Sequence, residues 1–299
     1  MKPLIADGFL VVDKSSGMTS HDVVAIARRA LKTKKVGHAG TLDPMATGVL
    51  VLGFGNATRL LQYITEGSKS YEAIMVLGAS TVTDDSEGSV LTAAPKEQIG
   101  LITDLAIREE LEKMRGKIMQ RPSSVSAVKV GGERAHARVR AGEEFELPAR
   151  EVTITELYVG EISRSEAVES IDVEIRVTCG AGTFIRAIAR DCGERLGIGG
   201  HLRVLRRTRV APFDLSHAIS IDELKAGDFV PIPMAEVAAN TFPCREITPQ
   251  ERIEISYGRN LVKNLTDEIT AAMSGNELLA LLQNLDEKAR PIAVFAAKT

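Results

Sequence analysis

The chain has 299 residues, of which 44% are hydrophobic and 26% are charged, and its net charge is −3. This composition is typical of a globular protein that can bury a full core, as one large domain or as a large and a small one. The sequence contains no uninterrupted run of about 18 apolar residues, which argues against a membrane-spanning helix. Residues 1–7 lack the apolar core of a signal peptide, so we expect a cytoplasmic protein with no membrane partner.

The first third of the chain predicts alternating strands and helices. A short buried strand is expected over 9–12, followed by a helix for which Ser20 is the predicted N-cap. A second strand is expected over 49–52. Asn56 is then predicted to cap another helix, which Gly67 ends.

The middle of the chain continues this pattern. A strand over 71–77 and a helix over 104–115 are expected, and the strictly alternating run 171–178 is the clearest half-buried strand. Gly180 to Gly182 then turn into a further helix. Between these elements, residues 121–144 mix Pro, Ser, Gly and Arg without periodicity and predict an exposed excursion.

Several strands alternate cleanly between apolar and polar residues, which favours antiparallel pairing. We therefore predict an α+β fold with a mixed, mainly antiparallel sheet flanked by helices. From about residue 240 the sequence becomes acidic, which predicts a domain boundary between 1–239 and a smaller module over 240–299.

The pattern of cysteines and histidines argues against a metal site. The three cysteines, Cys179, Cys192 and Cys244, are widely spaced and form no C-x-x-C pair, and the five histidines form no H-x-x-x-H pair. Neither a disulfide framework nor a zinc site follows from such spacing. We predict reduced, mostly buried thiols, no metal and no cofactor.

The positive charges are clustered although the chain is slightly acidic. Residues 220–299 carry 8 Lys and Arg against 12 Asp and Glu, which leaves 29 against 28 for the rest. Three groups stand out: Arg28, Arg29, Lys32, Lys34 and Lys35; Arg134, Arg138 and Arg140; Arg203, Arg206, Arg207 and Arg209. Local patches of this kind suit phosphate contacts, although a solvated face explains any single group equally well.

The loop around Asp43 is the strongest candidate for chemistry. Pro44 biases Asp43 toward extended backbone, and Gly37, Gly40 and Gly48 permit turns that other residues resist. A carboxylate aimed in this way suits covalent or acid–base catalysis. On spacing alone, an ordinary turn whose Asp accepts backbone hydrogen bonds explains the same residues.

The segment 37–48, Gly-His-Ala-Gly-Thr-Leu-Asp-Pro-Met-Ala-Thr-Gly, closely resembles the central motif of the TruB family of tRNA pseudouridine synthases. The preceding 8–20 resembles that family's opening strand and turn. Further ordered matches occur at 68–73, 180–191 and 201–208. The resemblance implies the α+β pseudouridine synthase fold followed by a small β-rich, PUA-like accessory domain.

The resemblance also implies the catalytic residues. Asp43 matches the catalytic aspartate, Tyr71 the active-site tyrosine, and Arg186 the arginine that pairs with the aspartate. Leu205 matches an apolar residue beneath the uracil, and His38 matches the wedge that fills the place of a flipped base. A core tyrosine, a surface arginine, a core leucine and a loop histidine are the plainer readings of these last four residues.

Basic side chains around this centre are implied to bind RNA: Lys129, Arg134, Arg206 and Arg207. Lys14 matches a lysine of the opening motif, for which a structural or a phosphate-directed role is implied. The excursion resembles the family's RNA-clamping segment, but Val125 stands where the usual pattern has a tyrosine. Val82 stands where many relatives carry an acid, so Asp85 is expected to play a supporting role only.

The implied function is isomerisation of uridine to pseudouridine in the T-loop of tRNA, at position 55. The implied partner is the T-arm and loop of tRNA, with no obligatory protein partner and no guide RNA. A tRNA-folding chaperone with modification secondary is the alternative. Nucleotide binding is disfavoured because Gly53-Phe54-Gly55 gives only part of G-x-G-x-x-G.

Overall fold

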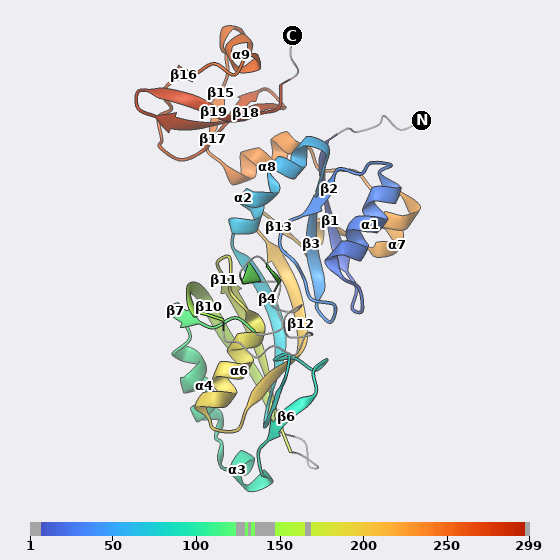
Figure 1. The fold of residues 1–299 in the computed structure, drawn as a ribbon, viewed down its shortest axis with the longest axis vertical. Coiled ribbons are helices and arrows are strands. Elements are labelled where there is room, and N and C mark those ends of the chain that lie inside the picture. Colours follow the sequence, from blue (N-terminus) through green and yellow to red (C-terminus); the bar gives the residue numbers. More distant parts are fainter. Residues whose placement is uncertain (1–6, 124–128, 131–132, 135–146, 165–168, 297–299) are drawn as a thin grey trace. The chain divides into compact units, whose positions relative to one another are not determined.

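The computed structural model describes residues 7–123, 129–130, 133–134, 147–164 and 169–296. The chain divides into two compact units: residues 1–43, 49–65 and 210–299 form the first, and residues 44–48 and 66–209 form the second. Figure 1 labels their helices and strands. Within the described residues, no helix is long and apolar enough to cross a membrane.

The N-terminal part of the first unit is built on a short sheet. Strand β1 pairs in parallel with β14, β3 follows β1 in the sheet, and β2 pairs antiparallel with the later part of β3. Helix α7 packs against α1 and β1. The elements of this part are β1 (Gly8–Lys14), α1 (Ser20–Ala30), β2 (Val36–His38), β3 (Thr47–Phe54), a 3-10 turn (Gly55–Arg59), α2 (Leu61–Glu66), β13 (Phe213–Asp214), a second 3-10 turn (Leu215–His217), β14 (Ala218–Ile219), α7 (Ile221–Ala226) and α8 (Met234–Thr241).

A five-stranded sheet forms the C-terminal part of the first unit, in the order β15-β17-β18-β19-β16. Its elements are β15 (Cys244–Glu246), α9 (Pro249–Ser256), β16 (Leu261–Val262), β17 (Thr270–Ser274), β18 (Glu277–Leu285) and β19 (Lys288–Val294). Met273, Leu278 and Leu281 of this sheet share one buried cluster with Phe9 and Val51. The β-rich character expected for this region is confirmed, and a domain boundary near residue 240 stays a prediction.

The second unit contains a twisted sheet in the order β12-β4-β11-β10-β7, whose β4–β11, β11–β10 and β10–β7 pairs are antiparallel. Helix α6 packs on β4, and α4 packs on β10 and α6. The elements are β4 (Lys69–Leu77), β5 (Ala79–Thr81), β6 (Val90–Ala93), α3 (Lys96–Leu101), α4 (Asp104–Glu112), β7 (Gly116–Gln120), β8 (Lys129–Val130), β9 (Glu133–Arg134), β10 (Arg150–Arg164), β11 (Ile171–Cys179), α6 (Ile185–Arg195) and β12 (Gly200–Val210).

These elements confirm the predicted α+β fold with its mixed, mainly antiparallel sheet. The alternation of residues 171–178 is that of β11, whose apolar side chains are buried every second residue. Both expected N-caps of the first third are wrong. Thr19, not Ser20, caps α1 through a capping box with Asp22, and Asn56 lies inside a 3-10 turn.

Candidate active site

The loop that carries Asp43 is fixed on the first unit by a buried serine. The Ser20 hydroxyl, at the start of α1, accepts a hydrogen bond from the Leu42 N–H at 2.9 Å and donates one to the Leu42 carbonyl at 3.1 Å. Ala39 N–H bonds the Val51 carbonyl at 2.9 Å. Because Thr19 caps the helix, the Ser20 side chain is available to hold the residue directly before Asp43.

Replacing Ser20 by Ala should therefore lower both the stability of the protein and the activity that depends on the Asp43 loop. Loss of the hydroxyl leaves the buried Leu42 N–H and C=O without this partner, which we expect to lower the free energy of unfolding by about 1–3 kcal/mol. Urea unfolding measures that change. Ser216→Ala, which removes an exposed hydroxyl bonded to Asp214 in the same unit, is the control and should stay within about 0.5 kcal/mol. Equal changes in the two variants would contradict this role of Ser20.

Two further predicted RNA-binding residues lie in the first unit. Lys14, at the end of β1, is completely buried, and its ammonium donates to the carbonyls of Ser15 and Met18 at 3.0 and 2.7 Å. Lys14 therefore fixes the turn between β1 and α1. His38, at the end of β2, meets the ring of His21 edge-on, with 5.6 Å between ring centroids.

The second unit carries the other residues that are predicted to surround the uridine. Tyr71 lies on β4 and Leu205 on the neighbouring strand β12, and their exposed fractions are only 8% and 6%. Arg186 lies on the first turn of α6 with 5% exposure. Asp43 and these three residues belong to different units, so their predicted assembly around one uridine stays a prediction.

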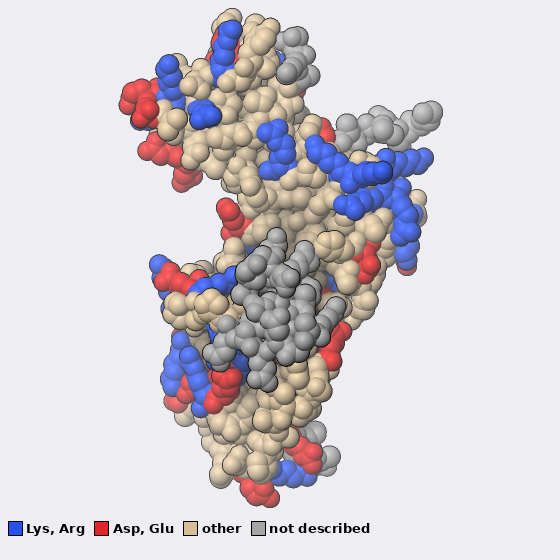
Figure 2. Space-filling model, viewed as in Figure 1, with Lys and Arg blue, Asp and Glu red and all other residues tan. Residues whose placement is uncertain are grey.

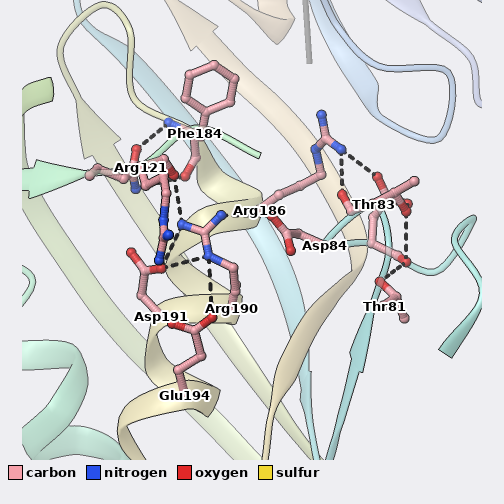
Figure 3. A network of polar contacts seen from close by, with 11 residues as sticks. Thr81, Thr83, Asp84, Arg121, Phe184, Arg186, Arg190, Asp191 and Glu194 are labelled. Carbon is pink, nitrogen blue, oxygen red and sulfur yellow. Dashed lines mark hydrogen bonds and ion pairs between the residues drawn. The ribbon is translucent and has the colours of Figure 1, made fainter. Parts of the chain in front are cut away.

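Arg186 is held by Asp85, for which only a supporting role was expected (Figure 3). Its Nη1 lies 3.1 Å from Asp85 Oδ2 and donates to the Thr83 carbonyl at 2.6 Å. Asp85 also accepts bonds from the Thr83 hydroxyl and the Glu87 N–H. A buried carboxylate with this many donors fixes the orientation of the arginine.

The start of α6 is fixed by the two strands that flank the predicted excursion. The Gln120 amide, at the end of β7, donates to the Phe184 carbonyl at 3.0 Å and accepts from the Phe184 N–H at 2.8 Å. Arg150, opposite Gln120 in the β7–β10 ladder, donates to the Gly182 carbonyl at 2.6 Å and lies over the Phe184 ring. Gln120 and Arg150, at the two strand ends, thus both hold the segment directly before Arg186.

The cations predicted on β12 differ in their surroundings. Arg207 is 1% exposed, whereas Arg206 is partly exposed and its guanidinium lies 3.4 Å from the Thr47 hydroxyl. Lys129 and Arg134 are register partners in the antiparallel β8–β9 pair. The rest of the expected RNA-clamping segment, 124–128, 131–132 and 135–146, lies outside the described residues.

Lys69 is a buried cation that the sequence did not single out. It lies on β4 two residues before Tyr71, opposite Cys179 in the ladder, and its ammonium donates to the Gly67 carbonyl at 2.9 Å. Burial, reinforced by the charge of Arg207, lowers the pKa of Lys69 from 10.5 to about 8. Burial also raises the pKa of the Cys179 thiol.

This buried lysine predicts a pH dependence of stability. Between pH 8 and 10.5 the unfolded chain binds the Lys69 proton and the folded chain does not, so wild-type stability rises with pH relative to Lys69→Met. Across that window the difference should change by up to about 3 kcal/mol. Urea unfolding of both proteins at several pH values measures it, and a difference that is independent of pH would contradict the assignment.

Metal-ligating side chains do not gather in the described parts of either unit. There, no group of three or more His, Cys, Asp or Glu side chains is placed to hold a metal ion. Cys179 and Cys192 are buried and Cys244 is exposed, all three with free thiols. The expectation that no metal or cofactor is needed stays a prediction.

Two family models match consecutive parts of this chain. The TruB family pseudouridylate synthase N-terminal domain matches residues 28–185, and the tRNA pseudouridylate synthase B C-terminal domain matches residues 186–229. The chain belongs to the TruB family. The resemblance expected from residues 37–48 is thereby confirmed.

TruB relatives match the chain over its whole length. A protein of Corynebacterium diphtheriae named tRNA pseudouridine synthase B is 44% identical, covering 100% of this chain and 99% of the relative. One of Paenarthrobacter aurescens with the same name is 49% identical, covering 98% and 96%. One of Thermobifida fusca, also so named, is 46% identical, covering 98% and 99%.

Solved structures share the fold of this chain. A chain of a Cbf5–Nop10–Gar1 complex is 26% identical with a TM-score of 0.70, covering 100% of this chain and 88% of that one. A chain of an H/ACA ribonucleoprotein bound to a substrate RNA containing 2′-deoxyuridine is 24% identical with a TM-score of 0.72, covering 99% and 87%. This second likeness shows the fold alone.

Proposed function

We propose that this TruB-family chain isomerises uridine to pseudouridine in tRNA. The observation that carries the proposal is the end-to-end match to proteins named tRNA pseudouridine synthase B at 44–49% identity. The Asp43 loop, held by Ser20 through Leu42, supplies the fixed carboxylate that such chemistry requires. The proposed target of the enzyme is the uridine at position 55 of the T-loop. This part of the proposal rests on the resemblance of residues 37–48 to the family motif.

The reaction needs no net oxidation or reduction. The N1–C1′ bond breaks, the detached uracil turns, and C5 bonds to C1′ while the hydrogen of C5 leaves as a proton and N1 gains one. Asp43 attacks the uracil ring, attacks the ribose, or removes a proton from the sugar. Tyr71 and Leu205 hold the base while it turns, and Arg186 orients the Asp43 carboxylate.

Lys and Arg side chains provide the phosphate contacts in this proposal. Figure 2 shows Lys and Arg side chains gathered where α1 ends and β2 begins, and the residues there are Arg28, Arg29, Lys32, Lys34 and Lys35, all exposed. Lys129, Arg134 and Arg206 add phosphate contacts from the second unit. Flipping the uridine out of its stack costs a few kcal/mol, and His38 fills the place that the base leaves. The module over 240–299 is accessory.

Tritium release tests the proposal. With tRNA transcripts carrying [5-³H]uridine, the purified protein should release one equivalent of tritium per tRNA, because C5 loses its hydrogen only when it bonds to C1′. A transcript with cytidine in place of U55 should release none. Release from both transcripts would contradict position 55, and release from neither would contradict the enzyme and leave a tRNA-folding chaperone as the explanation of any tight binding.

A further inference from the structure

Arg190 lies one helical turn after Arg186 on α6 and is the centre of a second ion-pair network (Figure 3). Its Nη1 lies 3.0 Å from Asp84 Oδ2, its Nη2 lies 2.7 Å from Asp191 Oδ1 and donates to the Arg121 carbonyl at 2.7 Å, and its Nε donates to Asp191 at 2.9 Å. The Glu194 carboxylate is at 4.0 Å. All three guanidinium nitrogens are therefore engaged, and the side chain is only 12% exposed.

Two adjacent aspartates bind two arginines that are four residues apart. Asp84 pairs with Arg190 and Asp85 pairs with Arg186, and residues at i and i+4 share one face of a helix. Asp84 has a φ of 58°, a left-handed conformation that few residues other than glycine, asparagine and aspartate adopt readily. A non-glycine residue in this conformation persists where its surroundings fix it, and here the Arg190 pair does so.

The same turn is also tied to β12. Ser86 N–H bonds the Leu202 carbonyl at 2.9 Å, and Leu202 N–H bonds the Asp84 carbonyl at 3.0 Å. Leu202 precedes Leu205 on that strand by three residues. The turn over 83–86 is thus held on one side by α6 and on the other by the strand that carries the predicted uracil-facing leucine.

We propose that Arg190 is a positioning residue for the isomerisation, a role that rests on the proposed function. Through Asp84 it fixes the 83–86 turn, and the turn in turn presents the Asp85 carboxylate that orients Arg186. Because the same guanidinium holds the Arg121 carbonyl, it also ties the end of β7 to this network. Lysine cannot replace it, since one ammonium does not offer the planar fork that reaches Asp84, Asp191 and Arg121 together.

Two variants test this role, Asp84→Asn and Arg190→Lys. Asparagine keeps the size of Asp84 and tolerates its φ, so that only the charge is lost. We expect the single-turnover rate of tritium release at saturating protein to fall about tenfold in both variants, while the dissociation constant for tRNA changes less than about twofold. Asp104→Asn, which removes an exposed ion pair with Arg164 in the same unit, should leave both quantities unchanged.

Hydrogen exchange provides a readout that does not depend on activity. Amides of residues 81–88 should exchange faster in Asp84→Asn and Arg190→Lys than in wild type, while the amides of β11 keep their protection. Wild-type rates and wild-type exchange in both variants would overturn the proposal. If wild type itself releases no tritium, the proposed function fails, and the exchange of residues 81–88 alone decides whether Arg190 holds the turn.

Discussion

Replacing Asp43 by Asn should abolish tritium release while tRNA binding persists. The amide has nearly the size of the carboxylate, so the loop held by Ser20 and Leu42 keeps its fold. An amide nitrogen or oxygen at this position is neither the nucleophile nor the base that each of the three routes requires. The rate should therefore fall by roughly 10²–10⁴-fold or more, the largest effect on activity that we expect from one substitution.

The experiment compares wild type, Asp43→Asn and a matched control under single-turnover conditions. Asp228→Asn changes an exposed aspartate of the same unit and should leave the rate unchanged. Filter binding of tRNA to each protein separates loss of chemistry from loss of substrate. A variant that binds tRNA and retains the wild-type rate would remove Asp43 from the mechanism.

Replacing Gly48 by Ala should cause the largest loss of stability. Gly48 has a φ of +100°, and a Cβ built on it would lie 2.1 Å from the Arg207 carbonyl oxygen and 3.0 Å from the Arg207 nitrogen. These atoms belong to the paired strand, where Arg207 lies opposite Gly48 in the β3–β12 ladder, so they cannot turn away as a side chain would. We expect the free energy of unfolding to fall by about 4 kcal/mol or more, or no folded protein to form.

Gly116→Ala separates the two causes of that loss. Gly116 has a similar φ of +85°, but no atom lies within 4 Å of a Cβ built on it. This variant therefore bears the backbone strain without the clash and should cost about 1–2 kcal/mol. Thermal or urea unfolding of both variants gives the comparison. Equal losses would show that the close approach to Arg207 contributes little.

Local pattern was sufficient to predict most elements and the family. The alternation in 171–178 and the apolar face after Gly182 predicted β11 and α6, because burial on one face imposes a period that one sequence displays. The motif around Asp43 led to the family. Both features depend on residues close together in the chain.

Contacts between distant residues were the ones that the sequence did not reveal. Thr19 and Ser20 are both good N-caps, and only the fold decides that the Ser20 hydroxyl turns to Leu42, 22 residues away. Arg190 and Asp84 are 106 residues apart. Arg207 belongs to a basic group that suggested a surface facing phosphate, yet its side chain is buried, because charge patterning does not report burial. Lys14, for which the family motif implied a structural or a phosphate-directed role, is buried as well.

Gln120 and Arg150 both hold the segment before α6, Gln120 through two hydrogen bonds to Phe184 and Arg150 from the facing strand. These contacts affect how far the sequence between them can change in such an enzyme. The chain leaves β7 and enters β10 at two residues that are both hydrogen-bonded to the segment directly before α6. Lengthening a loop between fixed ends costs little free energy, roughly 0.6 kcal/mol for each doubling. Insertions and exchanges between these two anchors should therefore cost little stability and leave the helix that carries Arg186 in place.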